Sequence, residues 1–179
     1  MKARVLFFIG TAVSVMLAAG PGFTQTRGLP PHGEGAMKHL ESSPRHGEWV
    51  TVEAGGGDQV DAWVVYPERG DAAPVVLVIH EIYGLTDWIR AVADQLAAEG
   101  FIAVAPDMLS GKAPGGGGSG SLSQDEARRL IRDLGWKEIE RRLNAAARYA
   151  VSLPAASPRY GVVGFCWGGG VSFRYATVQ

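Results

Sequence analysis

The residues most able to do chemistry surround the single cysteine of the chain, Cys166. It stands in the pattern Gly-x-Cys-x-Gly, from Gly164 to Gly168, directly after an apolar run that we interpret as a strand. The same spacing around serine forms a nucleophile elbow, a sharp strand-to-helix turn where glycines on each side prevent a steric collision. The helix that follows would aim its first N–H groups at the thiolate and at the oxyanion formed after attack on a carbonyl. The pattern therefore predicts a cysteine nucleophile, and the alternative is a buried, inert cysteine in a glycine-rich chain.

A second candidate is the pair His80-Glu81, which ends an uninterrupted apolar run. Charged groups at such a place are costly unless they face a cavity or a partner. In folds with a nucleophile elbow, the loop at this position donates one backbone N–H to the oxyanion hole. Here that donor would be Ile82, with Trp167 giving the other. The alternatives are a helix-capping carboxylate for Glu81 and a structural role for His80.

Two glycine patterns in the same chain are not taken as nucleotide sites. Gly115-x-Gly117-x-x-Gly120 matches the dinucleotide fingerprint, but it starts ten residues after Ala105 and opens no helix. Gly111-Lys112-Ala113 lacks the spacing of a phosphate-binding loop. We expect a flexible surface loop here.

The elements that must position these residues alternate between strands and helices. Two strands, joined as a hairpin, are predicted at 49–52 and 60–66. Three more strands, each predicted to be buried on both faces, are expected at 75–79, 101–105 and 160–163. Helices are predicted at 86–99 and at 136–151. A further helix is predicted to begin at Ser123, which is the first residue of a capping-box sequence. This order is typical of an α/β fold with a mainly parallel sheet flanked by helices, whose ligand sites gather at the carboxyl ends of the strands.

The N-terminal residues have a different composition. Residues 1–22 carry a short basic start, an apolar run and small residues, which predicts a signal peptide and export to the periplasm or outside the cell. The apolar run is shorter than a membrane span requires. We therefore expect no stable membrane span once the signal peptide is cleaved. The alternative is that residues 1–22 stay attached as an uncleaved N-terminal anchor. Residues 23–47 are rich in Gly, Pro, Ser and His and predict a linker or N-terminal arm.

Three histidines of that segment, His32, His39 and His46, recur every seven residues. A metal site is the functional alternative, but Pro30, Pro31 and Pro44 prevent one helix from aligning them. The linker interpretation is therefore favoured, and neither a metal nor an organic cofactor is predicted.

The composition excludes several classes of protein. The 179 residues are 46% apolar with a net charge of −1, which fits a globular domain and gives no electrostatic footprint for nucleic acid. One cysteine permits no intramolecular disulfide and no cysteine zinc cluster. A redox role lacks the Cys-x-x-Cys partner, so it ranks below a hydrolytic one. The sequence does not indicate an oligomeric state.

Three segments resemble the dienelactone hydrolase family: His80-Glu81-Ile82-Tyr83-Gly84-Leu85, then Pro106-Asp107, and Gly164-Phe165-Cys166-Trp167-Gly168-Gly169. The resemblance, which runs from about Glu48 to the last residue, implies an α/β-hydrolase fold and a Cys-His-Asp triad that cleaves a small-molecule ester or lactone. It implies Cys166 as nucleophile and Glu81 as the carboxylate that contacts the resting thiol. Ile82 and Trp167 would then be the oxyanion donors.

The sequence departs from the family pattern in two places. Where family members that act on dienelactone carry an arginine, this chain has Ser110-Gly111-Lys112, so Lys112 and Tyr83 are only candidate substrate contacts. In this fold the acid and the histidine follow the nucleophile, yet no Asp or His follows Cys166. We therefore expect residues 48–179 to be the N-terminal portion of the hydrolase domain, incomplete at its C-terminus and nearly inactive alone. The alternative is a non-catalytic binding module that keeps the cleft.

Overall fold

The structure is a computed structural model that describes residues 28–179. The predicted signal peptide, residues 1–22, lies outside these described residues, as does the start of the predicted linker. None of the described helices has the length and apolar character needed to cross a membrane.

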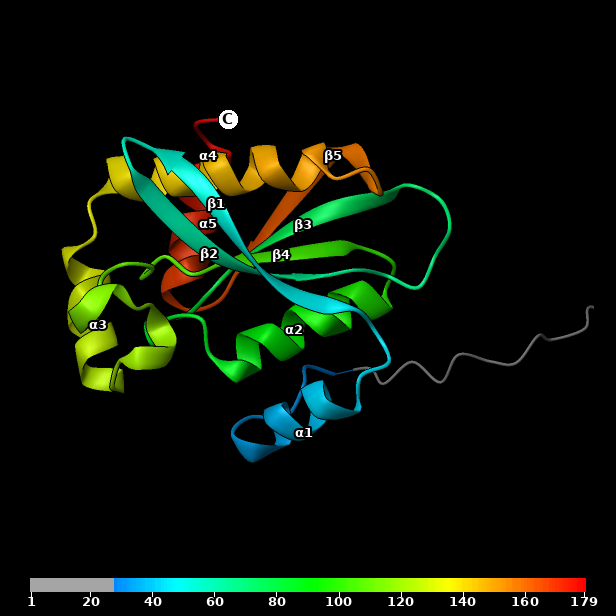
Figure 1. Ribbon diagram of the computed structural model, residues 1–179, viewed down its shortest axis with the longest axis horizontal. Coiled ribbons are helices and arrows are strands. Elements are labelled where there is room, and N and C mark those ends of the chain that lie inside the picture. The colour runs from blue at the N-terminus through cyan, green and yellow to red at the C-terminus, as the bar shows by residue number, and fades with distance from the viewer. Residues whose placement is uncertain (1–27) are drawn as a thin grey trace, which may run out of the picture.

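A five-stranded sheet forms the centre of the molecule, in the order β1-β2-β4-β3-β5 (Figure 1). The strands are β1 (Gly47–Gly55), β2 (Asp58–Val65), β3 (Ala73–Ile79), β4 (Ile102–Pro106) and β5 (Ala156–Gly164). β4, β3 and β5 run parallel, while β2 pairs antiparallel with both β1 and β4. The predicted α/β fold with a mainly parallel sheet is therefore confirmed, and so is the hairpin, in which Trp49 faces Trp63.

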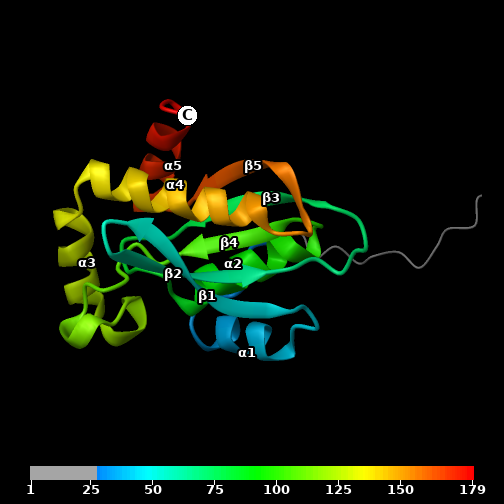
Figure 2. The same ribbon diagram turned by 45° about the horizontal axis from the view of Figure 1, so that its top comes forward.

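Helices cover both faces of this sheet. The helices of the described residues are α1 (Glu34–Ser42), α2 (Asp87–Ala98), α3 (Gln124–Asp133), α4 (Trp136–Ser152) and α5 (Trp167–Ala176). α2 packs on one face and α4 with α5 on the other, while α1 lies outside α2 (Figures 1 and 2). α3 stands near the edge where the parallel strands end (Figure 2). Two short 3-10 turns, η1 (Pro114–Gly116) and η2 (Ser119–Ser121), lie in the long loop after β4.

Local sequence signals explain where these helices begin and end. Thr86 is the N-cap of α2, and Gly100 follows its C-terminus with a φ of 94° that favours glycine. The predicted capping box at Ser123 is present: its side chain accepts the Glu126 N–H, and the Glu126 carboxylate accepts the Ser123 N–H.

Burial of the parallel strands agrees with prediction in two cases out of three. β4 is buried throughout, and β3 is buried over Leu77–Ile79. For residues 160–163 the prediction is wrong, because β5 is only half-buried or exposed along its length. Its one neighbour in the described sheet is β3, so its other edge lacks a strand.

The segment predicted as a linker or N-terminal arm also differs from a plain linker. Residues 34–42 form α1, whose Ala36 is fully buried against α2. The prolines flank this helix, so it contains only His39 of the three histidines, as the proline argument required. Packing against α2, rather than helical periodicity, holds this helix in place, and the division of the chain at residues 23–47 stays a prediction.

Candidate active site

The predicted strand-turn-helix is present at Cys166. β5 ends at Gly164, α5 begins at Trp167, and the cysteine between them is exposed. Cys166 has φ 52° and ψ −115°, and it is the one non-glycine residue with positive φ among residues 28–179. Such a conformation is strained, and it persists where the surrounding structure over-determines it.

Contacts between backbones explain why glycines flank the cysteine. A Cβ atom on Gly164 would lie 2.0 Å from the carbonyl oxygen of Gly168, and one on Gly168 would lie 2.4 Å from that of Ile79. The Phe165 N–H donates to the Ile79 carbonyl at 3.2 Å, which ties the turn to the end of β3. The Gly-x-Cys-x-Gly spacing is thus a steric requirement of this turn.

Two backbone N–H groups at this edge remain available for an anion. Trp167 is the first residue of α5, so its N–H has no acceptor within the helix. Neither that N–H nor the N–H of Ile82 donates a hydrogen bond within residues 28–179. The side chains of Ile82 and Trp167 pack against one apolar cluster under α3, so the structure brings the two predicted oxyanion donors to the same region.

His80 has a structural role. It is fully buried, its Nδ1 hydrogen bonds the Glu81 carbonyl at 2.7 Å, and its Nε2 accepts the Met108 N–H at 3.1 Å. Its ring also stacks on Trp167, with centroids 5.5 Å apart. Burial lowers the pKa of His80, against the raising effect of the Asp107 charge. The imidazole is therefore neutral, and both of its nitrogens are occupied.

Asp107 joins the loops that follow β3 and β4. Its carboxylate accepts hydrogen bonds from the N–H of Leu109 and from both the N–H and the hydroxyl of Ser119. The Ser119 hydroxyl in turn accepts the Leu85 N–H at 2.9 Å. Gly84, at φ 82°, passes so close that a Cβ there would lie 2.1 Å from the Ser119 hydroxyl oxygen. Sequence reasoning missed Ser119, because no periodicity marks a lone serine in a glycine-rich loop.

The remaining predicted residues lie in the loops at this edge, and their roles stay predictions. Glu81 and Tyr83 are half-buried in the turn after β3, where the Gly84 N–H donates to the Glu81 carbonyl. Among the described residues, no hydrogen bond joins the Glu81 carboxylate to the Cys166 thiol. Lys112 lies 2.7 Å from the Glu138 carboxylate, so its charge already has a partner.

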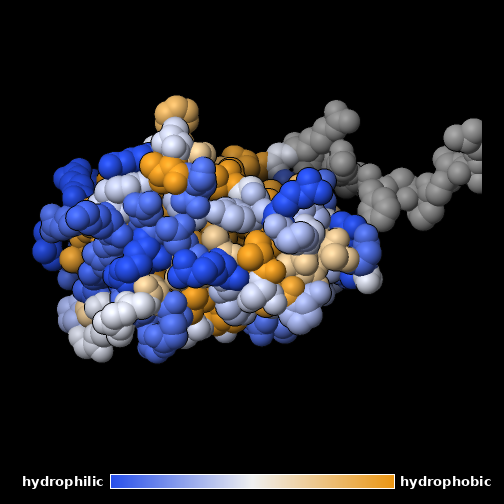
Figure 3. Space-filling view, turned by 90° about the horizontal axis from the view of Figure 1, so that it is seen from above, coloured by the Kyte–Doolittle hydropathy of each residue, from blue (hydrophilic) through white to orange (hydrophobic). Residues whose placement is uncertain are grey.

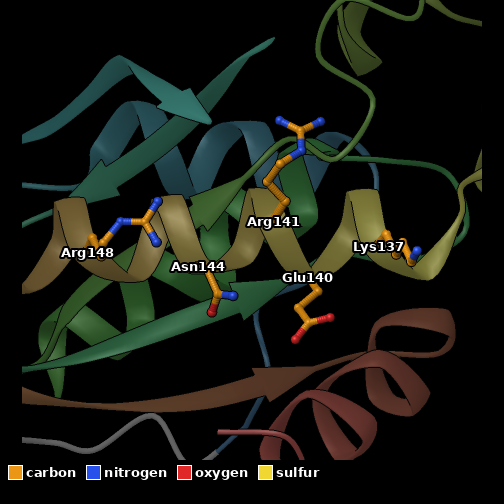
Figure 4. Close-up of a pocket in the computed structure, with 5 residues that line it drawn as sticks. All are labelled: Lys137, Glu140, Arg141, Asn144 and Arg148. Atoms are coloured by element: carbon orange, nitrogen blue, oxygen red, sulfur yellow. The ribbon is translucent and has the colours of Figure 1, made fainter. Parts of the chain in front are cut away.

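Two polar cavities lie away from Cys166. One, of about 410 Å³, contains Lys112 and Arg142 between the tip of the β1–β2 hairpin and the loop after β4. The other, of about 290 Å³, lies on α4 and is lined by Lys137, Glu140, Arg141, Asn144 and Arg148 (Figure 4). The view from the α4 side shows a largely hydrophilic surface with separate apolar patches (Figure 3). Neither cavity is lined by a residue of the elbow.

The three arm histidines have three different partners. His32 stacks on Trp88, His39 pairs with Asp94, and His46 lies near Glu48. Among residues 28–179, no group of three His, Cys, Asp or Glu side chains is arranged to hold a metal ion.

Comparisons with known proteins point to one family. A model described as the dienelactone hydrolase family matches residues 60–179. Carboxymethylenebutenolidase 1 of Cupriavidus pinatubonensis is 32% identical over 129 residues, covering 71% of this chain and 55% of that protein. A carboxymethylenebutenolidase of a Pseudomonas species is 32% identical over 131 residues, with 72% and 55% covered. The chain thus spans about half the length of these relatives.

Solved structures agree on the fold. The crystal structure of a dienelactone hydrolase-like promiscuous phosphotriesterase from metagenomic libraries has a TM-score of 0.61 at 23% identity, covering 75% of this chain and 54% of that one. At that identity the likeness supports the α/β-hydrolase fold alone.

Proposed function

Since the chain belongs to the dienelactone hydrolase family, we propose that its Cys166 is the nucleophile of a carboxylic ester or lactone hydrolase. The observation that carries the proposal is the exposed cysteine at φ 52°, held where β5 meets the N-terminus of α5. The relatives named as carboxymethylenebutenolidases support the lactone class.

The first half of the reaction is acylation of the cysteine. The Cys166 thiolate attacks the carbonyl carbon, a C–S bond forms, and the carbonyl electrons move to its oxygen. The N–H groups of Ile82 and Trp167 donate to that oxyanion, and the first turn of α5 adds a favourable dipole. The C–O bond then breaks and its electron pair stays on the leaving oxygen, which takes a proton from solvent water, while the acyl group remains on Cys166 as a thioester. Glu81 helps form the thiolate when substrate enters.

The second half is hydrolysis of the thioester by water, which needs a general base. His80 is unsuited to that task, because both of its ring nitrogens already form hydrogen bonds inside the fold. In the family pattern the base is a histidine placed after the nucleophile, held by an Asp. The residues described here are therefore proposed to form the acyl-enzyme, and release of the acid depends on that histidine.

Acylation is tested by mass spectrometry with an activated aryl ester. The folded chain is expected to gain one acyl group on Cys166, with phenolate released in equal amount. The chain unfolded in urea carries the same thiol without the elbow, so it should react more slowly, and Cys166→Ala should gain nothing. A folded chain that reacts no faster than the unfolded one would overturn the proposal in favour of a binding module.

The role of Glu81 has its own test. Glu81→Gln should slow acylation about tenfold or more, because general acid-base groups contribute at least that much. Glu99→Gln is the matched control, since Glu99 is an exposed carboxylate at the far end of α2. Equal rates for the two variants would remove Glu81 from the mechanism.

We propose further that residues 1–22 direct export, as their composition predicts. Expression in a Gram-negative host, followed by fractionation and N-terminal sequencing, should give a periplasmic chain that starts near residue 23. A chain that keeps residues 1–22 in the membrane fraction would contradict this.

A further inference from the structure

Two buried side chains of α2, Trp88 and Asp94, hold residues 28–46, here called the N-terminal arm, and the amide of Gln95 adds a hydrogen bond to the Gly28 carbonyl at 2.6 Å. The first is Trp88, whose indole Nε1–H donates to the Pro30 carbonyl at 2.9 Å. The His32 ring lies flat on Trp88, with centroids 4.4 Å apart and planes 16° from parallel. Trp88 is 7% exposed, so the arm covers a large aromatic side chain.

The second fastening is Asp94, a carboxylate on α2 that is 2% exposed. It accepts hydrogen bonds from the guanidinium of Arg45 at 3.0 and 2.6 Å, and it also bonds Ser43 and His39. Burial alone would raise the pKa of Asp94, but these hydrogen bonds and the Arg45 charge outweigh it and lower the pKa. A buried carboxylate with so many partners holds the arm in one position.

Trp88 also contacts the elbow. Its ring meets Phe165 edge to face, with centroids 5.1 Å apart and planes at 76°. Phe165 directly precedes Cys166, and its N–H is bonded to the end of β3. A row of three rings therefore extends from the arm to the residue before the cysteine, in the order His32, Trp88 and Phe165.

The residues on both sides of Cys166 are therefore held by packing. Phe165 packs into the cluster on the α2 face of the sheet, while Trp167 packs on the opposite side, where it stacks on His80. Cys166 lies between these two anchors at its strained φ of 52°. A strained residue keeps its conformation only while its neighbours are held, so support for Phe165 is also support for the cysteine.

We propose that the N-terminal arm is a positioning element for the nucleophile: His32 backs Trp88, which fixes Phe165 and thereby the conformation of Cys166. This rests on the proposed function in that it concerns the same cysteine. The arm lies 120 residues or more before Cys166 in the chain, and it helps to hold that residue without contact between the arm and substrate. His32 is a positioning residue in this scheme and not a catalytic one.

The test uses the one thiol of the chain, whose alkylation by iodoacetamide reports on the elbow alone. His32→Ala removes the ring that supports Trp88, and His32→Phe restores a flat ring. His46→Ala is the matched control, because His46 also lies in the arm and stacks on an aromatic residue, Tyr66, with centroids 5.6 Å apart. All rates are compared where circular dichroism shows the variants folded.

We expect alkylation at neutral pH to slow about threefold to tenfold in His32→Ala, the factor that corresponds to one lost aromatic pair. His32→Phe should restore the wild-type rate, and His46→Ala should leave the rate unchanged. An unchanged or faster rate in His32→Ala, or the same fall in His46→Ala, would overturn the proposal.

Trp88→Phe serves as the second variant if His32→Ala does not fold. It keeps a ring against Phe165 and loses the hydrogen bond to Pro30, so its alkylation rate should also fall; a wild-type rate would count against the proposal. Alkylation requires no ester cleavage, so the two proposals can fail separately. If His32→Ala slows alkylation but the wild type forms no acyl-enzyme, only the proposed hydrolase function is overturned. If the wild type forms the acyl-enzyme but His32→Ala leaves the alkylation rate unchanged, only the positioning role is overturned.

Discussion

A Cβ atom on Gly168 would lie 2.4 Å from the carbonyl oxygen of His80, so the first turn of α5 rests directly on the backbone that leaves β3. This contact brings the elbow against the loop that carries Glu81 and Ile82. The two groups of candidate residues are 80 or more positions apart in the chain, and a glycine at the contact allows them to meet. The close approach therefore assembles the site as well as relieving strain.

Gly168→Ala should destabilise the fold, because the new methyl group would overlap backbone atoms of both His80 and Ile79. We expect a loss of about 1–3 kcal/mol in the free energy of unfolding, as for other overpacked sites, measured by urea denaturation. Gly170→Ala is the control in the same helix, where a Cβ meets nothing within 4 Å. It should stabilise by about 0.5–1 kcal/mol, because alanine favours a helix interior. Equal stability of the two variants would refute the steric argument.

Ser119→Ala should weaken the junction between the loops after β3 and β4. It removes a donor to Asp107 and leaves the buried Leu85 N–H without its acceptor. Orphaning such a group costs about 1–3 kcal/mol, which thermal and urea unfolding would detect. Ser121→Ala, in the same turn but exposed, should stay within about 0.5 kcal/mol of wild type. If both serines behave alike, the Asp107–Ser119–Leu85 chain has no energetic role.

The sequence predicted those parts of the fold whose signals are local. The hairpin, the buried strands β3 and β4 and the capping box at Ser123 each depend on a few consecutive residues, and all are present. The elbow was also predictable, because its glycines act over only five positions. These features needed no knowledge of what packs against them.

The parts that sequence reasoning missed depend on distant partners. α1 has one fully buried residue, Ala36, so no apolar stripe marks it as a helix. Contacts with α2 hold it in place, among them those of Asp94, which lies about fifty positions after His39 and Arg45 and which no local pattern connects to them. The burial of β5 was overestimated for a similar reason, because an apolar run does not tell how many neighbours a strand has.

The stability of the fold should fall in mild acid because of His80. Burial lowers its pKa in the folded state, whereas the unfolded histidine titrates at about 6.5. Below that pH the unfolded chain binds a proton that the folded chain resists, so the free energy of unfolding decreases until the pH reaches the folded pKa. His80→Gln, whose amide oxygen can accept the Met108 N–H, should flatten this dependence in urea titrations at a series of pH values.

Asp94→Asn should release the N-terminal arm without unfolding the sheet. The substitution removes the charge that pairs with Arg45 and weakens the bonds to Ser43 and His39, a loss of about 1.5–3 kcal/mol for a charge-assisted contact. Limited proteolysis should then cut within residues 28–46 much faster than in wild type, while Glu41→Gln, at an exposed carboxylate on α1, should not change the rate.

Acid should have the same effect on the arm as the Asp94→Asn substitution. Because the folded pKa of Asp94 is lowered, the stability it gives is complete above about 3.9 and is lost as the pH falls through the folded pKa. Wild-type cleavage rates in Asp94→Asn would show that the aromatic contact with Trp88, and not the carboxylate, holds the arm.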